Sequence, residues 1–246
     1  MIIVKSRDEI AIMRQSGKIL AEILRQLKAA VRPSMKTSEL NDIMADEAKK
    51  WKVKLSFKNY QGFPGNLCVS VNDEIVHGIP GGRELQEGDI VSLDAGVIYH
   101  GFHSDSAITV GVGQVSTRAS DLMKVTEASL QAGIDQAVDG AHVGDISRAV
   151  QGYVEAHGYS VVREYTGHGV GRNLHEDPQV PNFNFGRGPM LRKGMTIAIE
   201  PMVNAGGWQT RGDQNHWTVL TADGSLSAHF EHTIAITGGK AEILTC

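Results

Sequence analysis

The chain of 246 residues contains only two cysteines, Cys68 and Cys246. Two cysteines cannot form the network of disulfides that holds small secreted proteins together, so the count favours a reducing compartment. Prolines are also few, seven in all, and no segment has the proline-, glycine- or serine-rich composition of a linker. We therefore expect a single domain over residues 1–246, which is long enough to bury a full core.

Long apolar runs and a strong excess of one charge are absent as well. No stretch has the length and apolar character of a membrane span, and Lys5 and Arg7 precede any apolar segment of signal-peptide length. The net charge is −4, with acidic and basic residues interspersed and no basic patch, which argues against a nucleic-acid-binding site. We expect a cytoplasmic protein without a membrane partner.

A pattern that occurs twice is the most informative part of the sequence. Residues Glu87–Gly96 read EGDIVSLDAG, and residues Lys193–Met202 read KGMTIAIEPM. In both segments a glycine that suits a turn is followed by an apolar stretch, and an acid stands six residues after the glycine, at Asp94 and at Glu200. The repetition indicates two equivalent strands that each end in a carboxylate.

The match continues downstream of both strands. The segment HSDSAIT contains Asp105 and corresponds to the segment HFEHTI, which contains Glu231. Four carboxylates thus occupy equivalent places in two pseudo-symmetric halves, about 1–115 and 116–246. Because carboxylates at the ends of apolar strands are costly to bury without a partner, we expect the four to share a cation.

Hydrophobic periodicity predicts four helices and several short strands. Ser6 and Glu9 form a capping-box pattern before a helix that should end before Pro33. The remaining predicted helices cover about 37–51, 120–137 and 145–157, and the predicted strands lie near 53–57, 67–71, 90–93 and 106–110. Pairs of helices that alternate twice with antiparallel hairpins indicate an α+β fold, with helices on one face of a curved sheet.

A second distinctive segment, TGHGVGRNLHEDP, covers residues 166–178. Its alternating glycines let the backbone pass close to a neighbour, and they leave His168 unobstructed on a loop or strand end. The segment is not a dinucleotide-binding fingerprint, because Arg172 occupies the place of the third glycine. It is not the helical zinc-protease motif either, because Pro178 would break the required helix.

Taken together, these residues resemble the type I methionine aminopeptidases, metallopeptidases of the pita-bread fold. The resemblance covers essentially the whole chain. We expect neither the extra N-terminal domain of related proline-cleaving peptidases nor the helical insertion of type II enzymes. The motifs that carry the resemblance are NDEIVHGIP from Asn72, SLDAG from Ser92, HSD from His103, GHGVG from Gly167, HEDP from His175, IEPM from Ile199 and EHT from Glu231.

The resemblance implies a site for two divalent metal ions. Its five ligands would be Asp94, Asp105, His168, Glu200 and Glu231, with Asp105 and Glu231 bridging the ions. Four carboxylates balance the charge of two divalent cations, which is consistent with this number. Carboxylate and imidazole ligands accept Co, Mn, Fe, Zn or Ni, so the identity of the metal stays open.

The resemblance also implies the reaction, which is removal of the N-terminal Met from peptides and nascent proteins when the second residue is small. Glu200 would shuttle the proton, and His77 and His175 would bind the substrate and support catalysis. The Met side chain would occupy an apolar pocket, where sulfur–aromatic contacts suit a thioether. The implied pocket residues are Tyr60, Phe63, Cys68 and Trp217.

Three departures from the family pattern concern the shape of the pocket: Phe63 where Tyr is common, Thr166 where Cys sometimes occurs, and Leu174 where an aromatic residue is usual. Two alternatives remain at this point: an Xaa-Pro aminopeptidase or dipeptidase of the same fold, and a binding protein of this fold that has lost its metals. The intact set of five ligands favours an enzyme. We expect a monomer, and association with the ribosome stays open.

Overall fold

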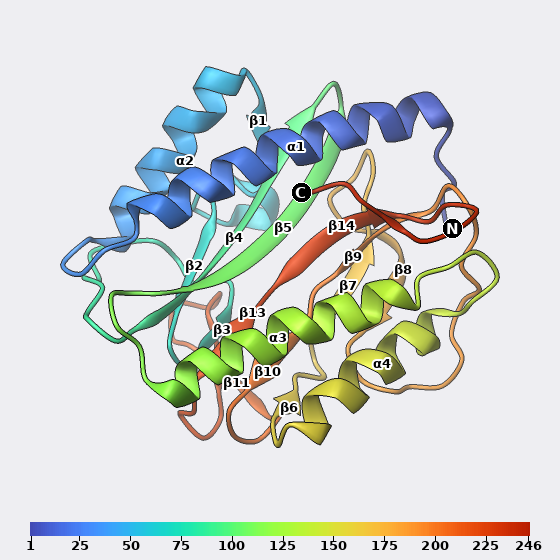
Figure 1. The fold of residues 1–246 in the computed structure, drawn as a ribbon. Coiled ribbons are helices and arrows are strands. Elements are labelled where there is room, and N and C mark those ends of the chain that lie inside the picture. The colour runs from blue at the N-terminus through green and yellow to red at the C-terminus, as the bar shows by residue number, and fades with distance from the viewer.

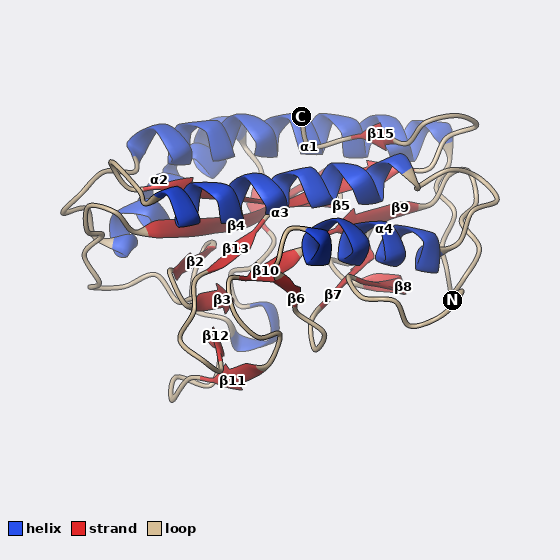
Figure 2. Ribbon diagram, turned by 60° about the horizontal axis from the view of Figure 1, so that its bottom comes forward, coloured by secondary structure: helices blue, strands red, loops and turns tan.

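The computed structural model describes all 246 residues and contains four α-helices that cover one side of a large antiparallel sheet (Figures 1 and 2). None of these helices is both long and apolar enough to cross a membrane. The α+β architecture predicted from the sequence is confirmed. The helices are α1 (Arg7–Ala30), α2 (Thr37–Trp51), α3 (Thr117–Asp135) and α4 (Val143–Ala156), and a short 3₁₀ helix, η1, covers Tyr60–Gly62.

The helix termini follow local sequence signals. The capping box predicted at the start of α1 is present, because Ser6 Oγ accepts a hydrogen bond from Glu9 N–H while Glu9 Oε2 accepts one from Ser6 N–H. The helix ends at Ala30, before Pro33, as expected. The predicted bounds of α2 are confirmed, whereas α3 and α4 begin slightly earlier than their periodicity indicated.

The large sheet has nine strands and the order β1-β4-β5-β14-β9-β7-β8, with β2 also paired to β4 and β15 to β14. Strands β4 and β5 are longer than predicted, since His100 and Gly101 join them in a two-residue turn in which both residues have positive φ. The strands are β1 (Lys54–Leu55), β2 (Cys68–Val71), β4 (Ile90–Tyr99), β5 (Phe102–Gly111), β7 (Thr166–Gly169), β8 (Glu176–Pro181), β9 (Thr196–Ile199), β14 (Glu231–Ala235) and β15 (Glu242–Ile243).

Two small sheets of three strands each lie beside the large one. In Figure 2 the strands β11 and β12 lie on the side of the large sheet opposite to the helices. The first small sheet has the order β13 (Ser227–His229), β10 (Met202–Asn204), β6 (Ser160–Val161), and the second has the order β11 (Thr210–Gly212), β12 (Val219–Thr221), β3 (Glu74–Val76).

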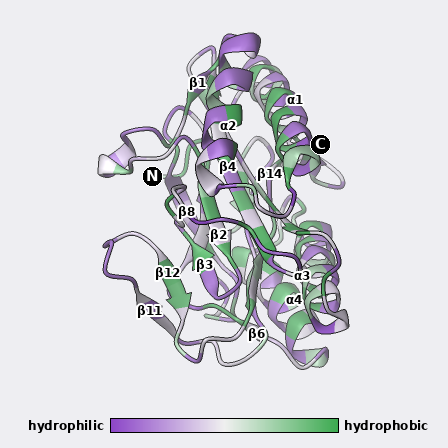
Figure 3. Cartoon of the chain, turned by 90° about the vertical axis from the view of Figure 1, so that its left-hand side faces the viewer, coloured by the Kyte–Doolittle hydropathy of each residue, from purple (hydrophilic) through white to green (hydrophobic).

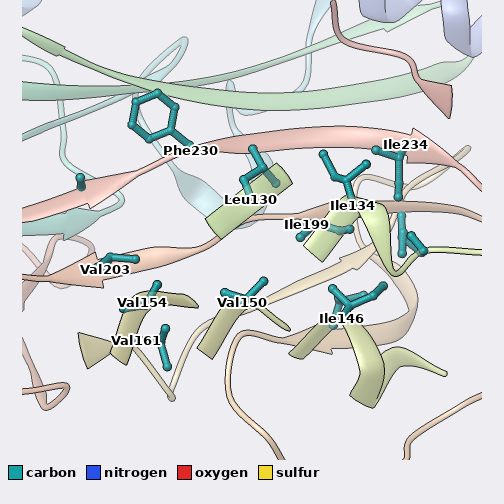
Figure 4. Close-up of a cluster of buried hydrophobic side chains, with 14 of the residues drawn as sticks. Leu130, Ile134, Ile146, Val150, Val154, Val161, Ile199, Val203, Phe230 and Ile234 are labelled. Carbon is teal, nitrogen blue, oxygen red and sulfur yellow. The ribbon is translucent and has the colours of Figure 1, made fainter. Parts of the chain in front are cut away.

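The core lies between the helices and the sheet. Along β4, the alternate residues Leu93, Ala95 and Val97 pack into one buried cluster with apolar residues of α1 and α2. A second buried cluster joins α3 and α4 to the second half of the chain (Figure 4). Its members include Ile199 of β9 and Phe230, which lies between β13 and β14. Figure 3 shows hydrophilic and hydrophobic bands along the helices, as expected where one helix face is buried.

This packing fixes which face of the sheet can carry a polar site. Successive side chains of a strand point to opposite faces, so Asp94, between Leu93 and Ala95, faces away from the helices. The sheet is continuous across residue 115, because β5 of the first half pairs with β14 of the second. The face opposite to the helices is therefore shared by both halves.

Two glycines in helices predict opposite effects of the same substitution. A Cβ at Gly17 in α1 would lie 2.1 Å from Leu244 O, whereas a Cβ at the exposed Gly152 in α4 would have no heavy atom within 4 Å. We expect Gly17→Ala to lower the free energy of unfolding by about 1–3 kcal/mol through overpacking. Gly152→Ala should raise it by about 0.5–1 kcal/mol through helix propensity. Urea unfolding curves test both, and a stabilised Gly17→Ala would contradict the assigned packing of α1.

Candidate active site

A row of residues across the sheet brings carboxylates from both halves to one face. Cys68 of β2 lies opposite Asp94 of β4, Asp94 lies opposite Ala107 of β5, and Ala107 lies opposite Glu231 of β14. Directly opposite residues project from the same face of a sheet. Asp105 precedes Ala107 by two positions and projects from this face as well. Three of the four predicted acids therefore share one surface of the sheet.

His168 and Glu200 complete the cluster from the strands of the second half. His168 Nε2 lies 3.7 Å from Asp105 Oδ2 and 3.5 Å from Glu200 Oε1. Asp105, His168 and Glu231 each offer one ligand atom, and these atoms lie within 4.8 Å of one another. His168 Nδ1 lies 2.8 Å from Gly169 O, which leaves Nε2 directed at the acids.

The glycines beside His168 allow close packing of strands. A Cβ at Gly167 would lie 2.3 Å from Ala198 O, and a Cβ at Gly169 would lie 2.2 Å from Asp177 O. The prediction that these glycines let the backbone pass close to a neighbour is confirmed. His168 itself lies within β7, so the close approach of the neighbouring strands brings it to the acids.

The electrostatics of the cluster favour bound cations. One oxygen each of Asp94, Asp105, Glu200 and Glu231 is buried without a hydrogen-bond partner. Burial raises the pKa of Asp94 to about 7. Burial, and then the neighbouring carboxylates, raise the pKa values of Asp105, Glu200 and Glu231 well above their ordinary range. Buried carboxylate oxygens without hydrogen-bond partners, together with Nε2 of His168, are a donor set that fits divalent metal ions.

His77 borders the cluster in an unusual backbone conformation. Its φ is +60°, in the left-handed region, and its carbonyl accepts a hydrogen bond from Thr218 Oγ1 at 3.4 Å. The following Gly78 is needed because a Cβ there would lie 2.1 Å from Val69 O. Burial lowers the pKa of His77 to about 4, which keeps the ring neutral. Backbone strain of this kind is common in functional sites.

His175 is held beside the cluster by an aromatic residue. Tyr60 Oη lies 2.8 Å from His175 Nδ1, and the His175 ring lies 4.1 Å from the His168 ring, centroid to centroid. Burial lowers the pKa of His175. With Nδ1 bonded to Tyr60, His175 Nε2 remains available to a substrate.

A single cavity of about 330 Å³ joins the acidic cluster to an apolar pocket. The pocket is built around a buried cluster of Phe57, Phe63, Cys68 and Leu174, against which Tyr60 and Trp217 pack. The ring of Phe63 meets that of Trp217 edge to face at 5.2 Å. Burial, and then Asp94, raise the pKa of the Cys68 thiol, so this cysteine behaves as an apolar wall.

All of the residues that the sequence proposed for the site line this one cavity. They are Tyr60, Phe63, Cys68, His77, Asp94, Asp105, His168, His175, Glu200, Trp217 and Glu231. Of the three departures from the family pattern, Phe63 and Leu174 line the cavity, whereas Thr166 lies in an adjoining hollow.

Three residues near the site were missed by sequence reasoning. Phe57 and Gln61 line the cavity from the segment around η1, where no motif marks them. His229 is buried, its Nε2 lies 3.9 Å from Glu200 Oε2, and neither ring nitrogen has a hydrogen-bond partner. A signal for His229 existed, because a histidine precedes the acid by two positions in both halves, at His103 and at His229.

Comparisons with known proteins agree with this geometry. The model of metallopeptidase family M24 matches residues 11–238. The chain is 52% identical over 246 residues to a methionine aminopeptidase of Clostridium perfringens, with 100% of this chain and 99% of the relative covered. It is 50% identical over 246 residues to methionine aminopeptidase 1 of Bacillus subtilis, with the same coverage.

Solved structures give the same result. The methionine aminopeptidase of Thermotoga maritima superposes with a TM-score of 0.98 at 45% identity, over 100% of this chain and 99% of that one. A prolidase of Pyrococcus horikoshii has a TM-score of 0.80 at 21% identity, over 99% of this chain and 63% of that one, a likeness of fold alone. The pita-bread fold implied by the motifs is confirmed, and the chain belongs to metallopeptidase family M24.

Proposed function

We propose that the protein is a metal-dependent aminopeptidase that removes the N-terminal methionine from polypeptides whose second residue is small. The observation that carries the proposal is the single cavity in which a buried acidic cluster adjoins an apolar pocket with aromatic and sulfur-containing walls. The full-length similarity to methionine aminopeptidases supports the same activity.

Two divalent cations would be held by the five polar residues of the cluster, with Asp105 and Glu231 bridging both. The charges support this number, because four carboxylates neutralise two divalent cations. When bound, such ions supply Lewis acidity that makes water a nucleophile near neutral pH. The ligand set admits Co, Mn, Fe, Zn or Ni. The proposed ligands are Asp94, Asp105, His168, Glu200 and Glu231.

The position of the pocket explains why a free N-terminus would be required. Cys68, in the pocket wall, lies directly opposite Asp94 in the sheet. A methionine side chain between Phe63, Cys68 and Trp217 therefore places its own α-amino group against the acidic cluster. An internal methionine carries a further peptide at that position, and this peptide would have to enter the buried acidic cluster. Burial of the side chain contributes about 1.5–3 kcal/mol, which favours Met without making the pocket absolute.

Three side chains would act on the scissile bond. His77 and His175, both neutral, can donate hydrogen bonds to the substrate and to the oxygen that gains charge during attack. Tyr60 fixes the ring of His175 through Nδ1. Glu200, whose Oε1 is buried without a hydrogen-bond partner, would accept the proton of the attacking water and deliver it to the leaving amine.

We further propose a cytoplasmic monomer built as one domain from two halves, with nascent chains among its substrates. The lining of the cavity includes all five proposed ligands together with His77 and His175, so one copy of the chain suffices for the proposed site. Both cysteines are free, and Cys68 is buried, which suits a reducing compartment.

The bridging assignment predicts different metal contents for two isosteric variants. Asp105→Asn should lose both ions, because one carboxylate would bridge them, whereas Asp94→Asn should retain one. Elemental analysis after loading with Mn²⁺ and dialysis tests this. Asp121→Asn, at an exposed position of α3, is the control and should bind two. Two tightly held ions in Asp105→Asn would contradict the bridging role.

The catalytic assignment predicts that His175→Ala lowers kcat by about 10²–10⁴-fold while the metal content stays normal, because a hydrogen-bonding or proton-transfer group is lost. Tyr60→Phe should cause a smaller loss of kcat, since only the orientation of the ring is released. His157→Ala, at an exposed position after α4, should leave kcat unchanged. Wild-type kcat in His175→Ala would exclude its catalytic role.

The substrate preference follows from the crowded surroundings of the scissile bond. The second side chain of the substrate would lie near His77 and His175, and a displacement of the carbonyl by about 1 Å can cost about 10²-fold in rate. We expect kcat/KM for Met-Ala-Ser to exceed that for Met-Leu-Ser by at least this factor. Equal values would refute the steric argument, and faster cleavage of Ala-Pro-Ser would assign the protein to the proline-cleaving class.

A further inference from the structure

A buried ion pair connects the start of the chain to the segment that carries His175. Lys5 Nζ lies 2.7 Å from Glu176 Oε2, and both side chains are only 3% exposed. Glu176 follows His175 directly in the sequence. The two partners are 171 residues apart, so the pair fixes a tertiary arrangement.

Both partners are themselves held in place. The backbone N–H of Lys5 donates to Gly194 O at 2.8 Å, and its Nζ donates a further hydrogen bond to Ile3 O at 3.2 Å. Glu176 Oε1 accepts a hydrogen bond from Asn173 N–H at 3.1 Å. The carboxylate thus closes a loop from Asn173 to Glu176, with His175 inside it.

The backbone around the pair is shaped to admit it. A Cβ at Gly171 would lie 2.6 Å from Glu176 Oε1 and 2.7 Å from Lys5 Cε, so a larger residue there would displace the ends of both side chains. The carbonyl of Gly171 also accepts a hydrogen bond from His103 N–H at 2.8 Å. The segment before His175 is therefore packed directly onto the ion pair.

Stability alone does not account for this arrangement. Removing two charges from water offsets most of their attraction, so a buried pair adds little stability over an apolar pair of similar volume. A second ion pair joins Arg172, the residue before this loop, to Glu9 of α1 at 3.2 Å. Its arginine side chain is 64% exposed, and such a pair contributes little stability. What the buried pair adds is a fixed geometry, and the residue that precedes Glu176 in the chain, His175, lines the cavity.

We propose that Lys5 is a positioning residue for catalysis, whose ion pair with Glu176 holds the Asn173–Glu176 loop so that His175 faces the scissile bond. The inference rests on the proposed role of His175. Lys5 does not line the cavity, and its Nζ is bonded to Glu176, so its effect would be transmitted through Glu176.

The test replaces the pair by apolar residues of similar volume, in the double variant Lys5→Met with Glu176→Leu. We expect its melting temperature and its Mn²⁺ content to match those of the wild type, because packing replaces the ion pair. The kcat for Met-Ala-Ser should fall about 10–100-fold with KM changed less than about threefold, because a misplaced His175 weakens only the transition state. Glu176→Gln, which keeps the shape of the side chain, should lower kcat in the same direction.

Lys49→Met is the matched control, because Lys49 pairs with Asp46 on the surface of α2 with the two side chains 77% and 66% exposed. It should retain the wild-type kcat. Wild-type kcat in the double variant, or a loss of activity that only follows a lower melting temperature, would overturn the positioning role. Failure of the wild-type protein itself to cleave Met-Ala-Ser would instead refute the proposed function.

Discussion

The central constraint on this structure is that four buried carboxylates lie together beside one face of the sheet and must be neutralised. Burial and mutual repulsion raise the pKa values of Asp105, Glu200 and Glu231 well above their ordinary range. Charged groups in such a place cost several kcal/mol each unless a counter-charge is present. Shared cations remove this cost and also supply the reactivity that the adjoining cavity can use. The same feature thus explains the acids, their burial and the proposed chemistry.

The fold meets this constraint by bringing the four acids and His168 together from strands that are far apart in the sequence. Asp94 and Asp105 come from the hairpin of β4 and β5, whereas the other proposed ligands come from β7, β14 and the end of β9. Pairing of β5 with β14 brings the two sets together, while α1 to α4 cover the opposite face (Figure 1). Because the helices take the apolar face of each strand, the polar face is left for the site. Prolidases share this architecture, so the fold itself does not select the substrate.

Much of this arrangement could be predicted from the sequence, since the signals are local and repeated. The apolar alternation around Asp94 and Glu200 predicts a strand and its buried face. It also makes the acid at the end of each strand stand out as a charged residue in an apolar segment. Phe57 and Gln61 could not be assigned in this way, because their place near the cavity depends on how the segment around η1 packs against the sheet. For His229 the repeat gives only its position before the acid, and its burial beside Glu200 depends on the tertiary fold. The Lys5–Glu176 pair is the extreme case: its partners are 171 residues apart, and although Glu176 stands in the HEDP motif, nothing in the sequence connects it with Lys5. Strands β4 and β5 are also longer than the sequence predicted. Their pairing continues past the apolar residues to the turn at His100 and Gly101.

The most direct test of this account is to locate the cations. Crystals of the protein soaked in Mn²⁺ would give anomalous scattering peaks at the positions of bound metal. We predict two peaks inside the cavity, both bounded by Asp105 and Glu231, one adjacent to Asp94 and the other adjacent to His168 and Glu200. An empty cavity in crystals that contain Mn²⁺, or peaks only at surface carboxylates, would contradict the claim that cations neutralise the buried acids.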